Sequence, residues 1–221
     1  MNELFTNVDW SDIWQATQDT LLMVSGSFVF TMLLGLPLGI MLFLTDRRQL
    51  LEQRGIYTLL AAITNILRSI PFVILLITVI PLTLLLVGTS LGVQGAIVPL
   101  VIGATPFFAR LVETALREVD RGVLEASQAM GATTRQIVFG VLLPESRPGL
   151  IAGATTTLIT LISYSAMSGV VGGGGLGDLA IRYGYQRFQT DVMVVTVVIL
   201  IVLVQILQMI GDKLVVHFSR K

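Results

Sequence analysis

One stretch of the chain, from Ser69 to Ala109, contains about 41 consecutive residues without a charged side chain. As a single α-helix it would be roughly 60 Å long, about twice the thickness of the hydrocarbon core of a membrane. The stretch must therefore fold back on itself, and the sequence GTSLG at 88–92 is the expected turn. Hydrophobic residues make up 54% of the chain and charged residues only 13%, which is well below the charged fraction of soluble domains. The predicted fold class is an all-α integral membrane protein.

Long uncharged intervals predict five transmembrane helices in a single domain over residues 1–221. Their approximate ranges are 20–45, 62–87, 93–112, 149–171 and 191–211. Each interval is long enough to cross about 30 Å of hydrocarbon, with some tilt in the longer ones. Residues 1–20 are acidic and carry no basic stretch before the first apolar run, so a cleaved signal peptide is not expected.

Basic residues gather in three segments that alternate along the predicted topology so as to share one side of the membrane. These segments are the loop at 46–56, the region at 110–147 and the C-terminal tail at 213–221. The opposite side carries only Arg182 and Arg187. By the positive-inside rule, we expect the N-terminus outside and the C-terminus in the cytoplasm.

Composition gives no support for a nucleic-acid partner, a metal or a cofactor on this chain. The formal net charge is zero and no basic block of the DNA-binding kind occurs. There is no cysteine, and the single histidine, His217, cannot form a metal site alone.

The segment at 118–148 combines frequent charge with helical patterning and lies between two strongly apolar regions. Asp120 is expected to cap a short helix over 121–130, and Gly131 to end it in the left-handed conformation. Thr133 and Gln136 have the spacing of a capping box that opens a second short helix. Pro144 is expected to stop that helix. The segment is therefore predicted to form a hairpin of two short helices.

The order of residues in this hairpin resembles the EAA loop of the permease subunits of bacterial ABC importers. That family's usual pattern is Glu-Ala-Ala, three residues, Gly, nine residues, Ile, any residue and Leu-Pro. The matching residues are Glu125, Ala126, Ser127, Gly131, Val141, Leu143 and Pro144. The chain departs from the pattern in having Ser127 for the second Ala and Val141 for Ile.

In that family the loop is a coupling helix that sits in a groove of a cytoplasmic ATPase. The resemblance implies the same role here for Leu124, Glu125, Ala126, Ser127, Ala129, Met130, Gly131 and Ala132. The alternative is an ordinary amphipathic connector between membrane helices.

The sequence GGGGLG at 172–177 formally matches a dinucleotide-binding fingerprint. We reject that match because a membrane-length apolar run precedes it, where the fingerprint requires a strand. No Walker A loop occurs in the chain, so any nucleotide that drives transport must bind a separate protein. The chain is therefore not expected to be an enzyme.

The segment at 169–188 is instead expected to be an external loop, with glycines for unusual backbone angles and aromatic residues at interfacial depth. Gly174, Gly175, Tyr183 and Tyr185 would form a docking surface for an extracytoplasmic binding protein. The alternative is a plain turn with an aromatic belt. The glycine pattern followed by Tyr-Gly-Tyr resembles the permeases of methionine importers in particular.

Two groups of residues are candidates for the permeation pathway. Arg68 is costly within a membrane, so it should face protein, a cavity or the headgroups. Helical spacing places Thr160, Ser163, Tyr164 and Met167 on one face, where they could line or close a pathway. The alternatives are snorkelling for Arg68 and ordinary helix packing for the second group. Glu113 is expected to pair with Arg110 or Arg117 at helical spacing.

The resemblance implies an inner-membrane permease that works as a homodimer in lipid. Its partners would be two cytoplasmic ABC ATPase subunits, which bind ATP and Mg²⁺, and a substrate-binding lipoprotein outside the cytoplasm. The implied mechanism is alternating access with methionine, L or D, as substrate. Alternatives are another small amino acid or related solute, or a scaffold that only anchors an ATPase. An intramembrane enzyme is a further alternative, but the spans contain few acid or base candidates.

Overall fold

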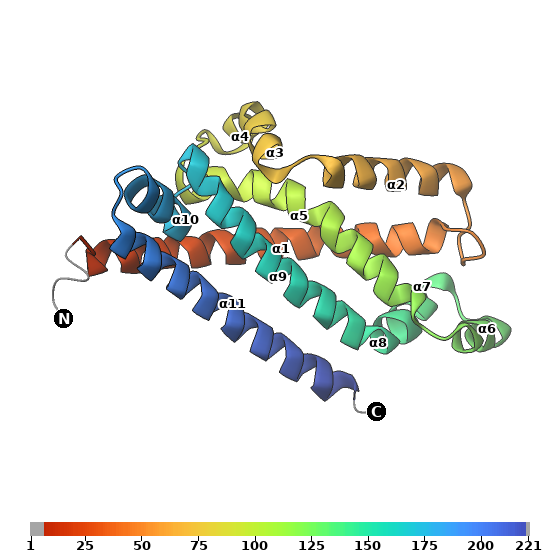
Figure 1. Ribbon diagram of the computed structural model, residues 1–221. Helices are drawn as coiled ribbons and strands as arrows, with labels where there is room; N and C mark the ends of the chain where they lie inside the picture. Colours follow the sequence, from red (N-terminus) through yellow and green to blue (C-terminus); the bar gives the residue numbers. More distant parts are fainter. Residues whose placement is uncertain (1–6, 220–221) are drawn as a thin grey trace. The chain divides into compact units, whose positions relative to one another are not determined.

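The computed structural model describes residues 7–219, and every regular element in that range is a helix (Figure 1). The elements in chain order are α1 (Trp10–Thr45), α2 (Arg54–Ser69), α3 (Phe72–Thr78), α4 (Ile80–Val87), α5 (Gly92–Arg117), α6 (Arg121–Ala129), α7 (Thr134–Ile137), a π-helical turn (Val138–Leu142), α8 (Leu143–Glu145), α9 (Arg147–Ser168), a 3₁₀ turn (Gly169–Val171), α10 (Gly175–Leu179), a second π-helical turn (Ala180–Tyr185) and α11 (Thr190–Ser219).

Four of the described helices, α1, α5, α9 and α11, are long and apolar enough to cross a membrane. α2 and α3, which are separated by a sharp bend, are together also long and apolar enough to cross. If this pair is counted as one span, the number of candidate spans is five. α1 begins at Trp10, well before residue 20, where the uncharged interval starts. Its start follows Asp9, which accepts hydrogen bonds from the hydroxyl and amide of Ser11 at 2.8 Å. These bonds lower the pKa of Asp9.

The predicted second span, 62–87, is not one helix but parts of three. α2 ends at Ser69, α3 begins at Phe72 and α4 begins at Ile80. Pro71 lacks a backbone N–H and disfavours helical conformation at the residue before it, which accounts for the break between α2 and α3. The predicted turn at 88–92 is present, and both of its glycines adopt positive φ, 78° at Gly88 and 69° at Gly92.

The chain forms two compact units, and the four long helices contribute residues to both. Unit 1 contains the described residues of Met1–Phe30, Ile70–Ala104 and Leu158–Gln208. Unit 2 contains those of Thr31–Ser69, Thr105–Thr157 and Met209–Lys221.

Unit 1 has two apolar clusters. The larger buries Met23, Leu100 and Leu161 completely and includes Phe72. Phe72 stacks in parallel on Tyr164, with ring centroids 4.2 Å apart. The smaller cluster contains Ile13, Ala16, Leu176, Leu179 and Val192, so it joins the start of α1 to α10 and α11.

Unit 2 is built around a single cluster that joins the end of α1, the second half of α5 and the segment that follows α5. Its buried members are Phe43, Leu44, Phe108, Val112, Leu116, Val119, Leu124, Ile137, Val138 and Leu142. Gly39 allows α1 to approach α5 closely, because a Cβ there would lie 2.5 Å from the Cβ of Val112 and 2.6 Å from the carbonyl oxygen of Ala109. The short helices α6 and α7 are therefore packed onto the same core as the long helices of the unit.

Candidate functional site

Two short helices, α6 and α7, are present in the segment at 118–148, and the capping interactions expected from the sequence are formed. The carboxylate of Asp120 accepts hydrogen bonds from the amides of Gly122 (2.7 Å) and Val123 (3.3 Å) at the start of α6. Gly131 adopts a φ of 81° just after α6. Thr133 and Gln136 form both halves of a capping box at the start of α7.

Pro144 does not stop the second helix, contrary to the expectation from the sequence. Helical conformation continues through a π-helical turn at Val138–Leu142 into α8, which contains Pro144. A proline cannot donate to the carbonyl four residues before it, and its ring crowds that carbonyl. The wider turn directly before Pro144 relieves this conflict, so the chain is redirected without leaving helical geometry.

The residues of α6 and its C-terminal turn divide into an inner and an outer set. Leu124 and Ser127 are buried, and the hydroxyl of Ser127 donates to the carbonyl oxygen of Val123 at 2.8 Å. Among the other predicted coupling residues, those exposed are Glu125, Ala126, Ala129, Met130 and Gly131, and Ala132 is half-buried. Met130 is 81% exposed, so a large apolar side chain lies on the outer surface directly after α6. The outer surface of α6 is therefore shallow, apolar in part and centred on one carboxylate.

A loop with exposed arginines is attached to the start of α6. Arg121 donates a hydrogen bond to the carbonyl oxygen of Arg48 at 3.3 Å. Arg48 adopts a φ of 60°, and its amide donates to the carboxylate of Glu52 at 2.9 Å. The loop that joins α1 to α2 thus has an internal hydrogen bond and a second hydrogen bond to the first residue of α6.

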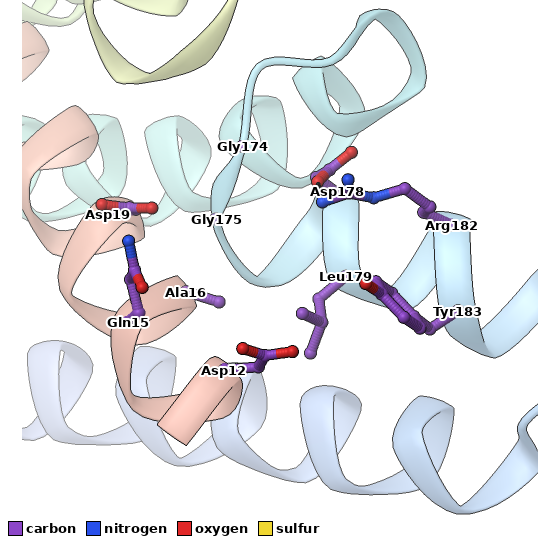
Figure 2. Close-up of a pocket in the computed structure, with 10 residues that line it drawn as sticks. All are labelled: Asp12, Gln15, Ala16, Asp19, Gly174, Gly175, Asp178, Leu179, Arg182 and Tyr183. Atoms are coloured by element: carbon purple, nitrogen blue, oxygen red, sulfur yellow. Dashed lines mark hydrogen bonds and ion pairs between the residues drawn. The ribbon is translucent and has the colours of Figure 1, made fainter. Parts of the chain in front are cut away.

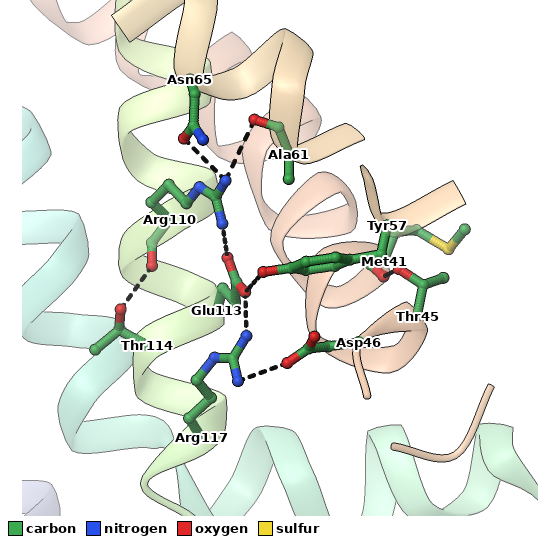
Figure 3. A network of polar contacts seen from close by, with 10 residues as sticks. All are labelled: Met41, Thr45, Asp46, Tyr57, Ala61, Asn65, Arg110, Glu113, Thr114 and Arg117. Carbon is green, nitrogen blue, oxygen red and sulfur yellow. Dashed lines mark hydrogen bonds and ion pairs between the residues drawn. The ribbon is translucent and has the colours of Figure 1, made fainter. Parts of the chain in front are cut away.

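A buried carboxylate, Glu113, lies at the centre of a polar network in unit 2 (Figure 3). Arg110 donates to it at 2.6 Å and Arg117 at 2.5 Å, so both pairings expected from helical spacing are confirmed. The hydroxyl of Tyr57 lies 3.5 Å from the same carboxylate. Arg117 also pairs with Asp46 at 2.7 Å. The network connects the segment after α1, α2 and α5.

Arg68 is exposed at the end of α2 and lines a cavity of about 700 Å³ between α2 and the second half of α5. Its guanidinium carbon lies 6.0 Å from the centroid of the Phe107 ring. Arg68 therefore faces a cavity of unit 2, together with residues of the Glu113 network.

The glycine segment of unit 1 is mostly helical, and the expected external loop is limited to a few residues. Gly172, Gly174 and Gly175 adopt φ values of 79°, 79° and 75°. α10 begins at Gly175 and continues into the second π-helical turn, which ends at Tyr185. A Cβ on Gly175 would lie 2.5 Å from the hydroxyl of Thr20, so only glycine fits at this approach to α1. The sequence suggested a loop because glycines dominate it, but Leu176 and Leu179 are buried and anchor a helix.

A cavity of about 250 Å³ lies beside this segment (Figure 2). Gly174, Gly175 and Tyr183, three of the predicted docking residues, line it. The fourth, Tyr185, does not line this cavity and is 70% exposed. The guanidinium carbons of Arg187 and Arg182 lie 4.5 Å and 5.4 Å from the centroid of the Tyr183 ring.

Carboxylates at the same cavity were not singled out from the sequence. The polar residues that line it are Asp12, Gln15, Asp19, Asp178 and Arg182. Asp178 and Arg182 form an ion pair within one helical turn. Asp12, Gln15 and Asp19 are spaced three and four residues apart, which places them on one face of α1. This spacing is visible in the sequence, and it could have identified the polar face of α1 that lines the cavity.

The four candidate pathway residues of α9 belong to unit 1 and differ in exposure. Ser163 and Met167 are exposed, with Met167 at 44%. Thr160 is half-buried, and Tyr164 is half-buried against Phe72. The structure thus assigns Arg68 and the α6 residues to unit 2, and the α9 and glycine-segment residues to unit 1.

Comparison with known proteins gives consistent matches over most of the chain. The chain is 55% identical over 200 residues to the probable D-methionine transport system permease protein MetI of Vibrio cholerae, covering 90% of this chain and 89% of that protein. It is 50% identical over 208 residues to the methionine import system permease protein MetP of Bacillus subtilis, covering 94% of each.

A solved structure has the same fold. A chain from an inward-facing crystal form of the MetNI methionine ABC transporter matches with a TM-score of 0.93 and 48% sequence identity, covering 96% of this chain and 100% of that chain. The family model described as "Binding-protein-dependent transport system inner membrane component" matches residues 35–221. The chain therefore belongs to the family of inner membrane components of binding-protein-dependent transport systems.

Proposed function

We propose that the chain is the permease subunit of an ATP-driven methionine importer. The observation that carries this proposal is the exposed surface of α6, a helix that is capped by Asp120 and followed by the capping box of α7. The named function of relatives at 50% and 55% identity over at least nine-tenths of the chain supports methionine as the substrate. The chain contributes no nucleotide site, and a partner ATPase hydrolyses ATP.

The proposed topology has five spans, with α2 and α3 counted as one broken span. The N-terminus lies outside and the C-terminus lies in the cytoplasm. The distribution of Arg and Lys supports this orientation. α6 then lies on the cytoplasmic side, where an ATPase can reach it.

α6 is the proposed coupling helix, and its residues divide between docking and anchoring. Glu125, Ala126, Ala129 and Met130 are exposed and form the docking surface for the ATPase. Leu124 is buried in the core cluster of unit 2, so it transmits movement of α6 to α1 and α5. Gly131 and Ala132 form the turn that fixes the position of α7.

Transport follows alternating access in a homodimer with two ATPase subunits. ATP closes the ATPase pair and draws the two coupling helices together, and hydrolysis returns the dimer to the inward-facing state. A binding protein docks at Gly174, Gly175, Tyr183 and Tyr185 and releases methionine, L or D, into the pathway. Thr160, Ser163, Tyr164 and Met167 line that pathway, and Met167 from two copies closes it.

Uptake by proteoliposomes that contain this chain, its ATPase and its binding protein tests the proposal. The wild-type complex should accumulate labelled methionine only with ATP inside. Glu125→Lys should remove uptake while the chain still inserts, because it reverses the charge at the centre of the docking surface. Glu118→Lys is the matched control, since Glu118 is also exposed but precedes α6.

Two results would contradict the proposal in different ways. Normal uptake by the Glu125→Lys complex would refute the docking role of α6. ATP hydrolysis without accumulation of methionine in the wild-type vesicles would refute the transport function. A calorimetric titration of the binding protein distinguishes methionine from another small amino acid.

A further inference from the structure

The cavity between α2 and α5 in unit 2 has polar residues in both of its walls. From α2 it is lined by Tyr57, Ala61, Asn65 and Arg68, which recur at spacings of three and four residues and so share one face. The facing wall from α5 includes Phe107, Arg110, Leu111 and Thr114. In membrane-spanning proteins such polar faces line protein contacts or water-filled spaces.

The opposite face of α2 is apolar. Leu59, Ile63 and Ile66 are each exposed, and their positions on the helix are turned away from the cavity-lining residues. Acyl chains would meet α2 on that apolar face. The cavity is thus suited to a small polar ligand, and a lipid tail is the less favoured occupant.

Most charges at the cavity are already neutralised. Glu113 accepts from Arg110 and Arg117, and Arg117 also pairs with Asp46. Two carboxylates therefore balance two guanidinium groups. Within residues 7–219, Arg68 forms no ion pair with a carboxylate. The cavity therefore carries one positive charge that has no counter-charge in the described chain.

The cavity also offers hydrogen-bond donors, which, like the positive charge of Arg68, favour an anionic ligand. The side-chain oxygen of Asn65 accepts from Arg110 at 2.9 Å, which leaves the amide nitrogen of Asn65 as a donor with no acceptor in the described chain. Arg68 offers a planar group of donors that suits an oxyanion. The buried carboxylate of Glu113 already has three donors, so it offers little to a ligand's ammonium group.

We propose that this cavity binds the carboxylate of the transported amino acid on Arg68 and Asn65. The ligand's apolar side chain would lie against Phe107 and Leu111, and a thioether packs favourably beside an aromatic ring. The inference rests on the proposed transport function and assigns the transported substrate a contact in unit 2. It predicts that recognition requires the carboxylate and tolerates changes at the amino group.

Cysteine labelling tests the site without relying on transport activity. The chain has no cysteine, so Thr114→Cys introduces a single thiol in the wall of the cavity. The complex with its ATPase is placed in phosphatidylcholine nanodiscs, and intact mass reports the rate of labelling of this chain by methanethiosulfonates. Methionine should slow the labelling, and methionine amide, which lacks the carboxylate, should not.

Arg68→Gln in the Thr114→Cys background tests the role of the positive charge. Loss of Arg68 should remove protection by methionine. Labelling rates are also compared for an anionic and a cationic methanethiosulfonate. Loss of Arg68 should lower the ratio of the anionic to the cationic rate about tenfold, because one unit charge acts with opposite sign on the two reagents. The matched control is Arg54→Gln, an arginine on the same helix that is 72% exposed and lies outside the cavity. It should leave both the protection and the ratio unchanged.

Methionine uptake is measured with the same variants in proteoliposomes that also contain the ATPase and the binding protein, so that the two proposals can fail separately. Uptake without protection of the thiol at saturating methionine would overturn the carboxylate site and leave the transport function intact. Protection by anionic phosphatidylglycerol in place of methionine would assign the cavity to a lipid headgroup and also overturn the site. Absence of methionine uptake by the wild-type complex would refute the transport function and, with it, this inference. If Thr114→Cys itself impairs uptake, Ala61→Cys provides the reporter on the facing wall.

Discussion

Replacement of Glu113 by glutamine should strongly destabilise unit 2. The side chain of Glu113 is 4% exposed and accepts charge-assisted bonds from Arg110 at 2.6 Å and Arg117 at 2.5 Å. Bonds to charged groups contribute about 1.5–3 kcal/mol each, and breaking a buried pair costs about 3–5 kcal/mol. Arg117 is 41% exposed and keeps its partner Asp46, so most of the loss comes from Arg110. We expect the free energy of unfolding to fall by about 3 kcal/mol.

Reversible unfolding by dodecyl sulfate in mixed micelles, followed by far-UV circular dichroism, measures this loss. Glu118→Gln is the matched control, because Glu118 is exposed and the same substitution should cost less than about 0.5 kcal/mol there. A double-mutant cycle of Glu113→Gln with Arg110→Gln should give a coupling energy of about 1–3 kcal/mol. Equal losses for the two glutamate variants, or a coupling energy near zero, would refute the network as a source of stability.

Three further substitutions test local features. Gly39→Ala should cost about 1–3 kcal/mol by overpacking against Val112, whereas Gly55→Ala, with no atom within 4 Å of the added Cβ, should not destabilise the chain in the same unfolding assay. Gly131→Ala should cost about 1–2 kcal/mol, because its φ of 81° strains any residue with a Cβ. Thr133→Ala should cost about 1 kcal/mol, detected as faster amide exchange confined to α7; unchanged exchange would refute the contribution of the capping box.

The starts of α6 and α7 could be predicted from the sequence because the capping interactions are local. Asp120, Gly131 and the pair Thr133 and Gln136 act on backbone groups within three residues of themselves, so sequence spacing alone identifies them. The two ion pairs of Glu113 were predictable for the same reason, since all three residues lie on one helix.

The wider network around Glu113 could not be predicted in this way. Tyr57, Asn65 and Asp46 reach it from other segments of the chain. Their positions depend on how α2 and the end of α1 pack against α5, and hydrophobic periodicity does not determine this packing. The broken span at 62–87 was missed for a related reason, because hydropathy measures the length of an apolar run and not its direction.

The helix α6 is anchored in the apolar cluster of unit 2. Leu124 on the inner side of α6 belongs to the same apolar cluster as Phe43 of α1 and Leu116 of α5. Moving α6 alone would unpack these side chains, and emptying a single large apolar site costs about 2–5 kcal/mol. Moving the cluster as one body breaks none of these contacts. A force applied to the exposed residues of α6 should therefore displace the adjoining ends of α1 and α5 together with it, which is the behaviour that a coupling helix requires.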